Sequence, residues 1–128
     1  MNPYHHALSS VAKFGGKVED YLPIHDWFDS SKASSTDPRH RALKHHSQGI
    51  FMCQEQFGHT IKNSIGKEIP TRFIGEQHVK EDLGRIPDMM DWYKEIKPQK
   101  WMIITMRVPK EVSEKLMQNI PTQLSTSR

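Results

Sequence analysis

The sequence predicts a mainly α-helical protein, a compact bundle of four to five helices with a small β-hairpin and a short C-terminal strand. Capping residues and prolines occur where these helices begin, and glycines occur where they end. Apolar residues within the helical segments recur three or four positions apart, which places them on one helix face. We therefore expect a helical body over residues 1–102, with the hairpin at about 59–69, and a basic strand–helix extension over residues 103–128.

The first half of the chain carries start and stop signals for three helices. Pro3 suits the first turn of a helix over about residues 3–14, which a pair of glycines ends. Asp20 is a suitable cap for a second helix over about residues 20–32. An Asp-Pro pair starts the third helix, which extends over residues 38–57 and ends at a glycine.

The second half of the chain begins with a change of pattern. Two short segments around a polar turn predict the hairpin, which needs the helices beneath it to be stable. Further proline and glycine signals predict more helices, and a segment rich in strand-forming residues predicts the late strand. The expected order is hairpin 59–69, helix 70–83, short helix 87–96, strand 101–108 and helix 109–119.

Length and composition exclude several classes of protein. At 128 residues and 14.9 kDa, the chain fits one domain with its own core. It has no apolar run near the ~20 residues that a membrane helix needs, and its first residues do not resemble a secretory signal. Cys53 is the single cysteine, so an internal disulfide and a multi-cysteine zinc site are excluded. We expect a protein of the reducing cytoplasm that does not contact membranes.

The charge distribution bears on the expected partners. The net charge is +3, and the basic excess lies after residue 96. The body is close to neutral and has no long basic stripe, so nucleic acid is not an expected partner. Residues 104–111 resemble the strand and helix start of ribbon-helix-helix DNA-binding proteins, but the second helix of that motif has no counterpart. An exposed strand there would favour pairing with a second copy, so a homo-oligomer, in particular a dimer, is expected.

Histidine is unusually frequent, with eight in the chain. On the predicted third helix, Arg39 and His46 interrupt a face that is otherwise nearly apolar. A buried arginine or histidine costs free energy unless it is paired. The sequence therefore predicts a polar partner across the core for each of them. The positions of that face are Arg39, Leu43, His46, Ile50, Cys53 and Phe57.

The other helices also direct imidazoles inward. His25 shares a face with two aromatic residues and is followed by Asp26, and two adjacent histidines lie near the apolar face of the first helix. His78 and Asp82 are four positions apart, so both can reach one point above the fourth helix. Helical bundles build metal sites from side chains on facing helices. The predicted ligands are His5, His6, His25, His46, His78 and Asp82.

A second interpretation needs no metal. Each histidine can be a hydrogen-bonded core residue, and histidine–carboxylate and Arg39–carboxylate pairs can hold the bundle. We expect His45 in solvent, because it lies on a different helix face from His46, and His59 at the surface of a turn.

Mixed imidazole and carboxylate ligands suit a divalent transition metal such as Zn, Mn, Fe or Ni. Such an ion with an open position generates hydroxide near neutral pH. Arg39 would then hold a phosphate, and Asp26 would ligate or orient a ligand. The hypothesis is a small metal-dependent phosphohydrolase. In their order, His5 or His6, His25 with Asp26, and Asp82 resemble the H…HD…D pattern of helical His-Asp phosphohydrolases.

Residues 5–102 also resemble an uncharacterised family of small bacteriophage and prophage proteins. The segments that carry this likeness are HHALSSVAKFGG, EDYLPIHDWFDSSK, DPRHRALKHH, IPTRFIGEQHVKEDLGRIP and KWM. The resemblance implies a viral origin, and hence the host cytoplasm, but no reaction. It leaves an alternative function, a non-enzymatic accessory protein that binds and modulates a host macromolecule. Its candidate anchors are Trp27, Trp92, Tyr93 and Trp101.

Overall fold

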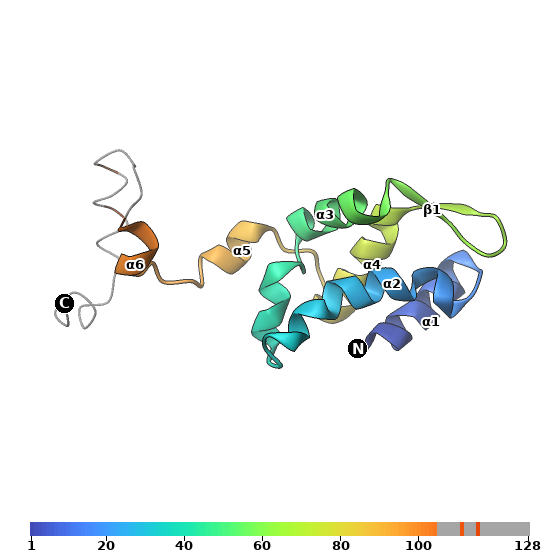
Figure 1. Ribbon diagram of the computed structural model, residues 1–128, viewed down its shortest axis with the longest axis horizontal. Coiled ribbons are helices and arrows are strands. Elements are labelled where there is room, and N and C mark those ends of the chain that lie inside the picture. Colours follow the sequence, from blue (N-terminus) through green and yellow to red (C-terminus); the bar gives the residue numbers. More distant parts are fainter. Residues whose placement is uncertain (105–110, 112–114, 116–128) are drawn as a thin grey trace. The chain divides into compact units, whose positions relative to one another are not determined.

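The computed structural model describes residues 1–104, 111 and 115. The chain forms two compact units, Met1–Asp91 and Trp92–Arg128. The described residues are mainly helical and include one two-stranded antiparallel sheet, which confirms the predicted fold class (Figure 1). Within this part of the chain, no helix is both long enough and apolar enough to cross a membrane.

The first two helices form a helical hairpin: α1 spans Pro3–Phe14 and α2 spans Val18–Asp29. Asn2 caps α1 through its side chain, and Gly15, whose φ is 80°, ends it in a conformation that favours glycine. The helix α2 begins two residues before Asp20, because the Asp20 carboxylate accepts the backbone N–H of Lys17 from inside the first turn. A short 3₁₀ helix, η1 over Ser30–Ala33, continues it.

The prediction of one helix over residues 38–57 is wrong. The segment forms a 3₁₀ helix, η2 over Pro38–Leu43, and then a separate α-helix, α3 over Ser47–Phe57. His46 is extended and caps α3, because its Nδ1 accepts the backbone N–H of Gly49. A Cβ at Gly49 would lie 1.7 Å from the carbonyl oxygen of Lys44, so the turn requires glycine. The break therefore destroys the predicted stripe of residues 39–57.

The predicted hairpin is confirmed, with β1 over Thr60–Lys62 paired to β2 over Glu68–Pro70. The turn between the strands is held by the Asn63 side chain, which accepts the backbone N–H groups of Ile65 and Lys67. The same side chain donates to the hydroxyl oxygen of Tyr21 on α2. The hairpin is thereby fixed to the helical hairpin beneath it.

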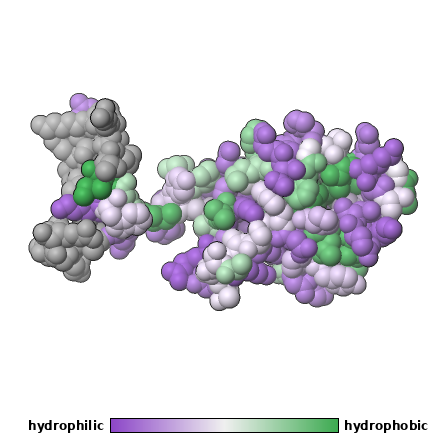
Figure 2. Space-filling view, in the orientation of Figure 1, coloured by the Kyte–Doolittle hydropathy of each residue, from purple (hydrophilic) through white to green (hydrophobic). Residues whose placement is uncertain are grey.

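Helix α4, over Thr71–Leu83, lies at the centre of the first unit and contacts α1, α2 and α3. It approaches α2 closely at Gly75, where an added Cβ would lie 3.1 Å from the Phe28 ring. On the face shown in Figure 2, hydrophilic residues cover much of this unit, with smaller hydrophobic areas between them. The apolar core consists of Ala7, Tyr21, Ile24, Phe28, Ile50, Cys53, Ile69, Ile74 and Val79.

The C-terminal predictions are met only in part. The short helix predicted over residues 87–96 is α5, over Met89–Tyr93. The strand predicted from residue 101 is wrong over its first residues, because α6 spans Lys100–Ile103 and the described residues offer it no partner strand. Apart from residues 104, 111 and 115, the rest of that strand and the helix predicted over 109–119 lie outside the described residues.

Candidate metal centre

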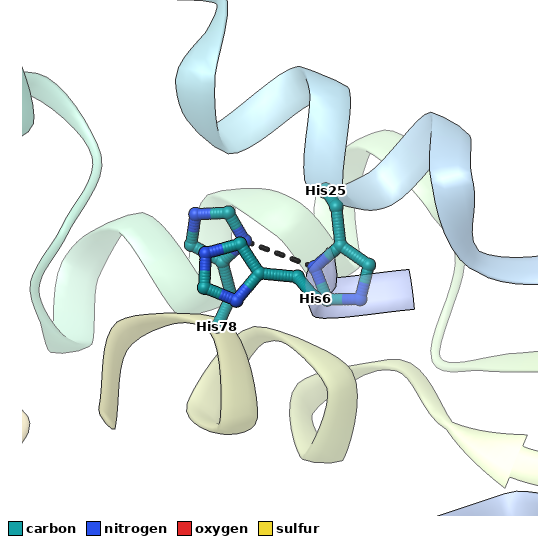
Figure 3. A group of neighbouring side chains, drawn as sticks. All are labelled: His6, His25 and His78. Atoms are coloured by element: carbon teal, nitrogen blue, oxygen red, sulfur yellow. Dashed lines mark hydrogen bonds between the residues drawn. The ribbon is translucent and has the colours of Figure 1, made fainter. Parts of the chain in front are cut away.

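Four imidazoles lie together inside the Met1–Asp91 unit. Figure 3 shows His6 from α1, His25 from α2 and His78 from α4. His45 joins them from the turn between η2 and α3, and all four side chains are fully buried. The ring centroids of His6 and His78 are only 3.9 Å apart. Because buried polar groups need partners, the surrounding contacts determine which nitrogen of each ring carries a proton.

Two helices present the same local pattern of ligands. His25 and Asp29 are four positions apart on α2, and His78 and Asp82 are four positions apart on α4. Residues at this spacing lie one above the other on a single helix face. Since α2 and α4 pack against each other, the two faces bring both carboxylates into the histidine cluster.

The hydrogen bonds of Gln77 fix a chain of donors that runs through the cluster. Its Nε2 lies 2.9 Å from the backbone oxygen of His6 and 2.9 Å from Oε1 of Glu81, and both oxygens accept. The other end of the amide, Oε1, lies 2.7 Å from Oγ of Ser10. An amide oxygen only accepts, so the Ser10 hydroxyl donates to it.

The chain continues from Ser10 to His78. Because the Ser10 proton is committed, His25 donates its Nε2–H to Oγ of Ser10 over 2.8 Å. Burial, and to a lesser extent the charge repulsion of His78 and His6, lowers the pKa of His25 to about 3. His25 is therefore neutral, and its Nδ1 accepts a hydrogen bond. His78 then donates its Nδ1–H to Nδ1 of His25 over 2.9 Å. The remaining nitrogen of His78, Nε2, faces Oδ1 of Asp29 at 3.3 Å and Oδ2 of Asp82 at 3.4 Å.

His6 reaches the same carboxylates from the opposite helix. Its Nδ1 lies 2.8 Å from Oε1 of Glu81, and its Nε2 lies 3.1 Å from Oδ1 of Asp82. Burial lowers the pKa of His6, but the hydrogen bonds to Asp82 and Glu81 outweigh burial and raise it above its ordinary value. As with His78, one ring nitrogen is held by an outer partner and the other points at a carboxylate.

The nitrogens that face the aspartates, Nε2 of His6 and Nε2 of His78, form a compact set of ligands with Asp29 and Asp82. One ligand atom each from His6, Asp29, His78 and Asp82 can be chosen so that all four lie within 4.8 Å of one another. A ring nitrogen without a hydrogen repels a carboxylate oxygen, so a cation must lie between them, either a proton or a metal ion. This buried histidine and aspartate cluster could hold a metal. A second set, His6, His25 and His78, meets the same distance criterion.

His45 holds the two aspartates in place. Its Nε2 lies 3.0 Å from Oδ2 of Asp82 and 3.5 Å from Oδ1 of Asp29. Burial raises the pKa of Asp82, but hydrogen bonds with His45, His6 and His78 hold it far below its usual range. For Asp29, hydrogen bonds with His45 and His78 likewise outweigh burial and lower the pKa. Both aspartates are therefore ionised and suited to a divalent cation.

The structure brings together four of the residues that the sequence singled out: His6, His25, His78 and Asp82. His5 and Asp26 are exposed on the outer faces of α1 and α2. His5 precedes the buried His6 by one position and Asp26 follows the buried His25 by one position, and neighbouring residues of a helix point in different directions. His46 is buried, but both its nitrogens are used locally: Nδ1 caps α3, and Nε2 donates to the backbone oxygen of Leu43.

Arg39 does not reach the cluster. Its side chain is 89% exposed and pairs with the Asp37 carboxylate at 2.7 Å, because the 3₁₀ geometry of η2 turns it outward. The expectation of His45 in solvent is wrong, since the helix break after Leu43 turns it inward. His59 is exposed, as predicted.

Several residues of the cluster escaped sequence reasoning. Asp29 could have been found, because its spacing from His25 repeats the spacing of Asp82 from His78. Ser10 and Gln77 carry no comparable signal, since their roles depend on the packing of α1 against α2 and α4. Glu81 lies beside Asp82, but only the approach of His6 gives it a partner in the cluster.

Comparison with known proteins places the chain in a family without assigning a reaction. Residues 1–102 match the family described as Domain of unknown function (DUF6915). Neither the curated proteins nor the solved structures contain a significant match. The match covers more than half of the chain, so the chain belongs to the DUF6915 family.

Proposed function

We propose that this member of the DUF6915 family binds one divalent transition metal ion through His6, Asp29, His78 and Asp82 and hydrolyses a phosphoester. The observation that carries the proposal is the convergence of four ligand atoms from three helices within 4.8 Å. The outer nitrogens of both histidines are held by Glu81 and His25. Histidines that bind a metal characteristically donate their other N–H to such partners.

The charge of the ligand set fits a divalent ion. Two ionised aspartates balance its charge, and the imidazoles of His6 and His78 complete a set of four ligands. An ion that prefers six ligands, such as Mn²⁺, Fe²⁺ or Ni²⁺, would keep two positions for water and substrate, whereas tetrahedral Zn²⁺ would be closed by four protein ligands. Hydrolysis therefore favours one of the six-coordinate ions.

The surrounding residues would prepare the site for this chemistry. A bound divalent ion acidifies water and polarises an oxygen of the substrate. His45 keeps Asp82 oriented, and Glu81 keeps the His6 ring oriented with its Nε2 toward the centre. The burial of the cluster lowers the local dielectric constant and so strengthens these interactions.

Metal content tests the binding proposal directly. Protein without a histidine tag, purified without chelator, is expected to hold about one equivalent of a transition metal, or to bind one equivalent on addition and unfold at a higher temperature. Asp29→Asn should abolish this uptake. Asp26→Asn is the matched control, because Asp26 lies on the same helix but is exposed. Uptake below about 0.2 equivalents in the unmodified protein would remove the proposal.

Catalysis requires a separate measurement. Hydrolysis of 4-nitrophenyl phosphate and of bis(4-nitrophenyl) phosphate should depend on the added metal and vanish in Asp29→Asn. Metal uptake without turnover on any phosphoester would leave a metal-stabilised fold and contradict the enzymatic half of the proposal.

A second candidate function is supported by exposed aromatic residues. Tyr93 is 51% exposed and Trp101 is 64% exposed, and exposed aromatic side chains commonly anchor protein interfaces. We propose, as the alternative, an accessory protein of viral origin that binds a host macromolecule through these residues. A purified host partner should then lose affinity for both Tyr93→Ala and Trp101→Ala, whereas Asp29→Asn should leave that affinity unchanged.

A further inference from the structure

We propose that Arg41 binds an oxygen of the phosphate group of the substrate at the metal centre. The proposal rests on the metal site described above and adds a residue that recognises the substrate. Nη2 of Arg41 lies 3.9 Å from Oδ1 of Asp82, so the guanidinium is beside a proposed metal ligand. The side chain is 26% exposed, which places it between the cluster and solvent.

The guanidinium of Arg41 has an N–H donor that no described residue accepts. Its Nε is buried, yet it has no hydrogen-bond partner among the described residues. Its ion pair with Asp82 is long, whereas Asp82 is within 3.1 Å of both His6 and His45. A buried donor without a partner is costly unless a ligand accepts from it. A guanidinium offers five N–H donors in a plane, which matches two oxygens of a phosphate.

The backbone fixes Arg41 relative to the cluster. The carbonyl oxygen of Arg41 accepts the backbone N–H of His45 over 2.8 Å and that of Lys44 over 3.3 Å. His45 in turn holds Asp82 through its Nε2. The turn after η2 therefore places the guanidinium and the imidazole on the same carboxylate, one from the solvent side and one from the interior.

The charges around a loaded site favour an anion. A divalent ion would be balanced by Asp29 and Asp82. The other charges nearby are then three cations, Arg41, Lys32 and the N-terminal ammonium of Met1 at 3.3 Å from Oδ1 of Asp82, against the single carboxylate of Glu81. Lys32 approaches from η1, with Nζ at 3.9 Å from Oδ2 of Asp29. The excess positive charge suits a phosphate oxygen and not a neutral ester.

Arg39 provides a matched control on the same 3₁₀ helix. It has the same side chain, lies two positions before Arg41, and is exposed and paired with Asp37. Substitution of Arg39 removes an equal charge from the same element without touching the cluster. Any effect of Arg41 beyond that of Arg39 therefore reports its position at the metal centre.

The experiment measures binding of inorganic phosphate to Mn²⁺-loaded protein by isothermal titration calorimetry, with metal content determined for every sample. Arg41→Met should weaken phosphate binding by about tenfold or more, and Arg41→Lys should weaken it less, since it retains a charge but loses the planar donors. Arg39→Met should change it by less than about twofold. All three variants should retain the metal content of the unmodified protein.

The outcomes separate the two proposals. Equal phosphate affinity in Arg41→Met and Arg39→Met, or no phosphate binding by the loaded unmodified protein, overturns the role of Arg41 while the metal site stands. Failure of the unmodified protein to take up metal overturns the metal site and this inference with it. A folded Arg41→Lys variant that binds phosphate as the unmodified protein does would also contradict recognition by the guanidinium.

Discussion

Nδ1 of His25 lies 2.9 Å from Nδ1 of His78, so one buried imidazole donates its hydrogen to another. The direction of this bond follows from Gln77 and Ser10, which commit the Nε2–H of His25 elsewhere. It leaves Nε2 of His78 to hold either a proton or a metal ion at the place where two aspartates converge. A residue that is not itself in the favoured ligand set thus decides whether His78 can bind a metal.

Substitution of His25 should therefore weaken metal binding without removing a ligand. His25→Leu removes the acceptor for the Nδ1–H of His78, and we expect metal affinity to fall by about 10–100-fold, as is typical when an outer partner of a ligand is lost. His25→Asn keeps an acceptor near the position of Nδ1 and should lose less. Competition with a chromophoric chelator measures both affinities. Equal affinity in the unmodified protein and His25→Leu would show that the hydrogen-bond chain does not orient His78.

Asp82 should be essential both for the metal and for the metal-free fold. Its carboxylate is almost fully buried and contacts His6, His45 and His78. In Asp82→Asn these imidazoles lose their counter-charge, and loss of one partner of a buried pair costs about 3–5 kcal/mol of the free energy of unfolding. Urea unfolding of the metal-free proteins checks this. Asp26→Asn is the control and should stay within about 0.5 kcal/mol of the unmodified protein.

His46 should affect stability but not metal binding. Its Nδ1 caps α3 at Gly49, and its Nε2 is held by the backbone of Leu43. His46→Ala should lower the free energy of unfolding by about 1 kcal/mol, while His46→Asn should retain most of the cap. Metal content should be unchanged in both variants. A loss of metal from folded His46→Asn would place His46 among the ligands and contradict the geometry.

Cys53 should be unreactive until the protein unfolds. Burial raises the pKa of its thiol from 9.0 to about 12, so the thiolate is negligible in the folded state at neutral pH. Ellman's reagent at pH 8 should label Cys53 only after addition of denaturant. Rapid labelling of the folded protein would contradict the buried position.

The same thiol predicts a loss of stability at high pH. Because the folded pKa lies above the unfolded value, the stabilisation is complete below about pH 9 and is lost as the pH rises toward 12. The free energy of unfolding should therefore decrease above pH 9 in the unmodified protein. Cys53→Ala should show a shallower decrease over the same range, although it is less stable at pH 7 because of the cavity. Parallel curves for the two proteins would contradict the shifted thiol.

Signals within a few residues of each helix end were sufficient to predict most of the helices. Proline at the start of α1 and glycine after α1, α3 and α4 act through backbone conformation within a few residues, so their effect is visible without a structure. The inward orientation of His25 and His78 is of the same kind, because it depends on spacing along one helix. The break at residues 44–46 was not visible, since it depends on the approach of Gly49 to the Lys44 carbonyl.

By itself, the sequence determined which helices form and that several of them carry imidazoles toward the interior, because helix ends and helix faces are set by neighbours in the chain. Only the tertiary structure decided that His6, His78, Asp29 and Asp82 converge, that His45 supports them and that His46 does not. These assignments depend on how α1, α2 and α4 cross, and contacts between residues 49 and 76 positions apart leave no local signal in the chain.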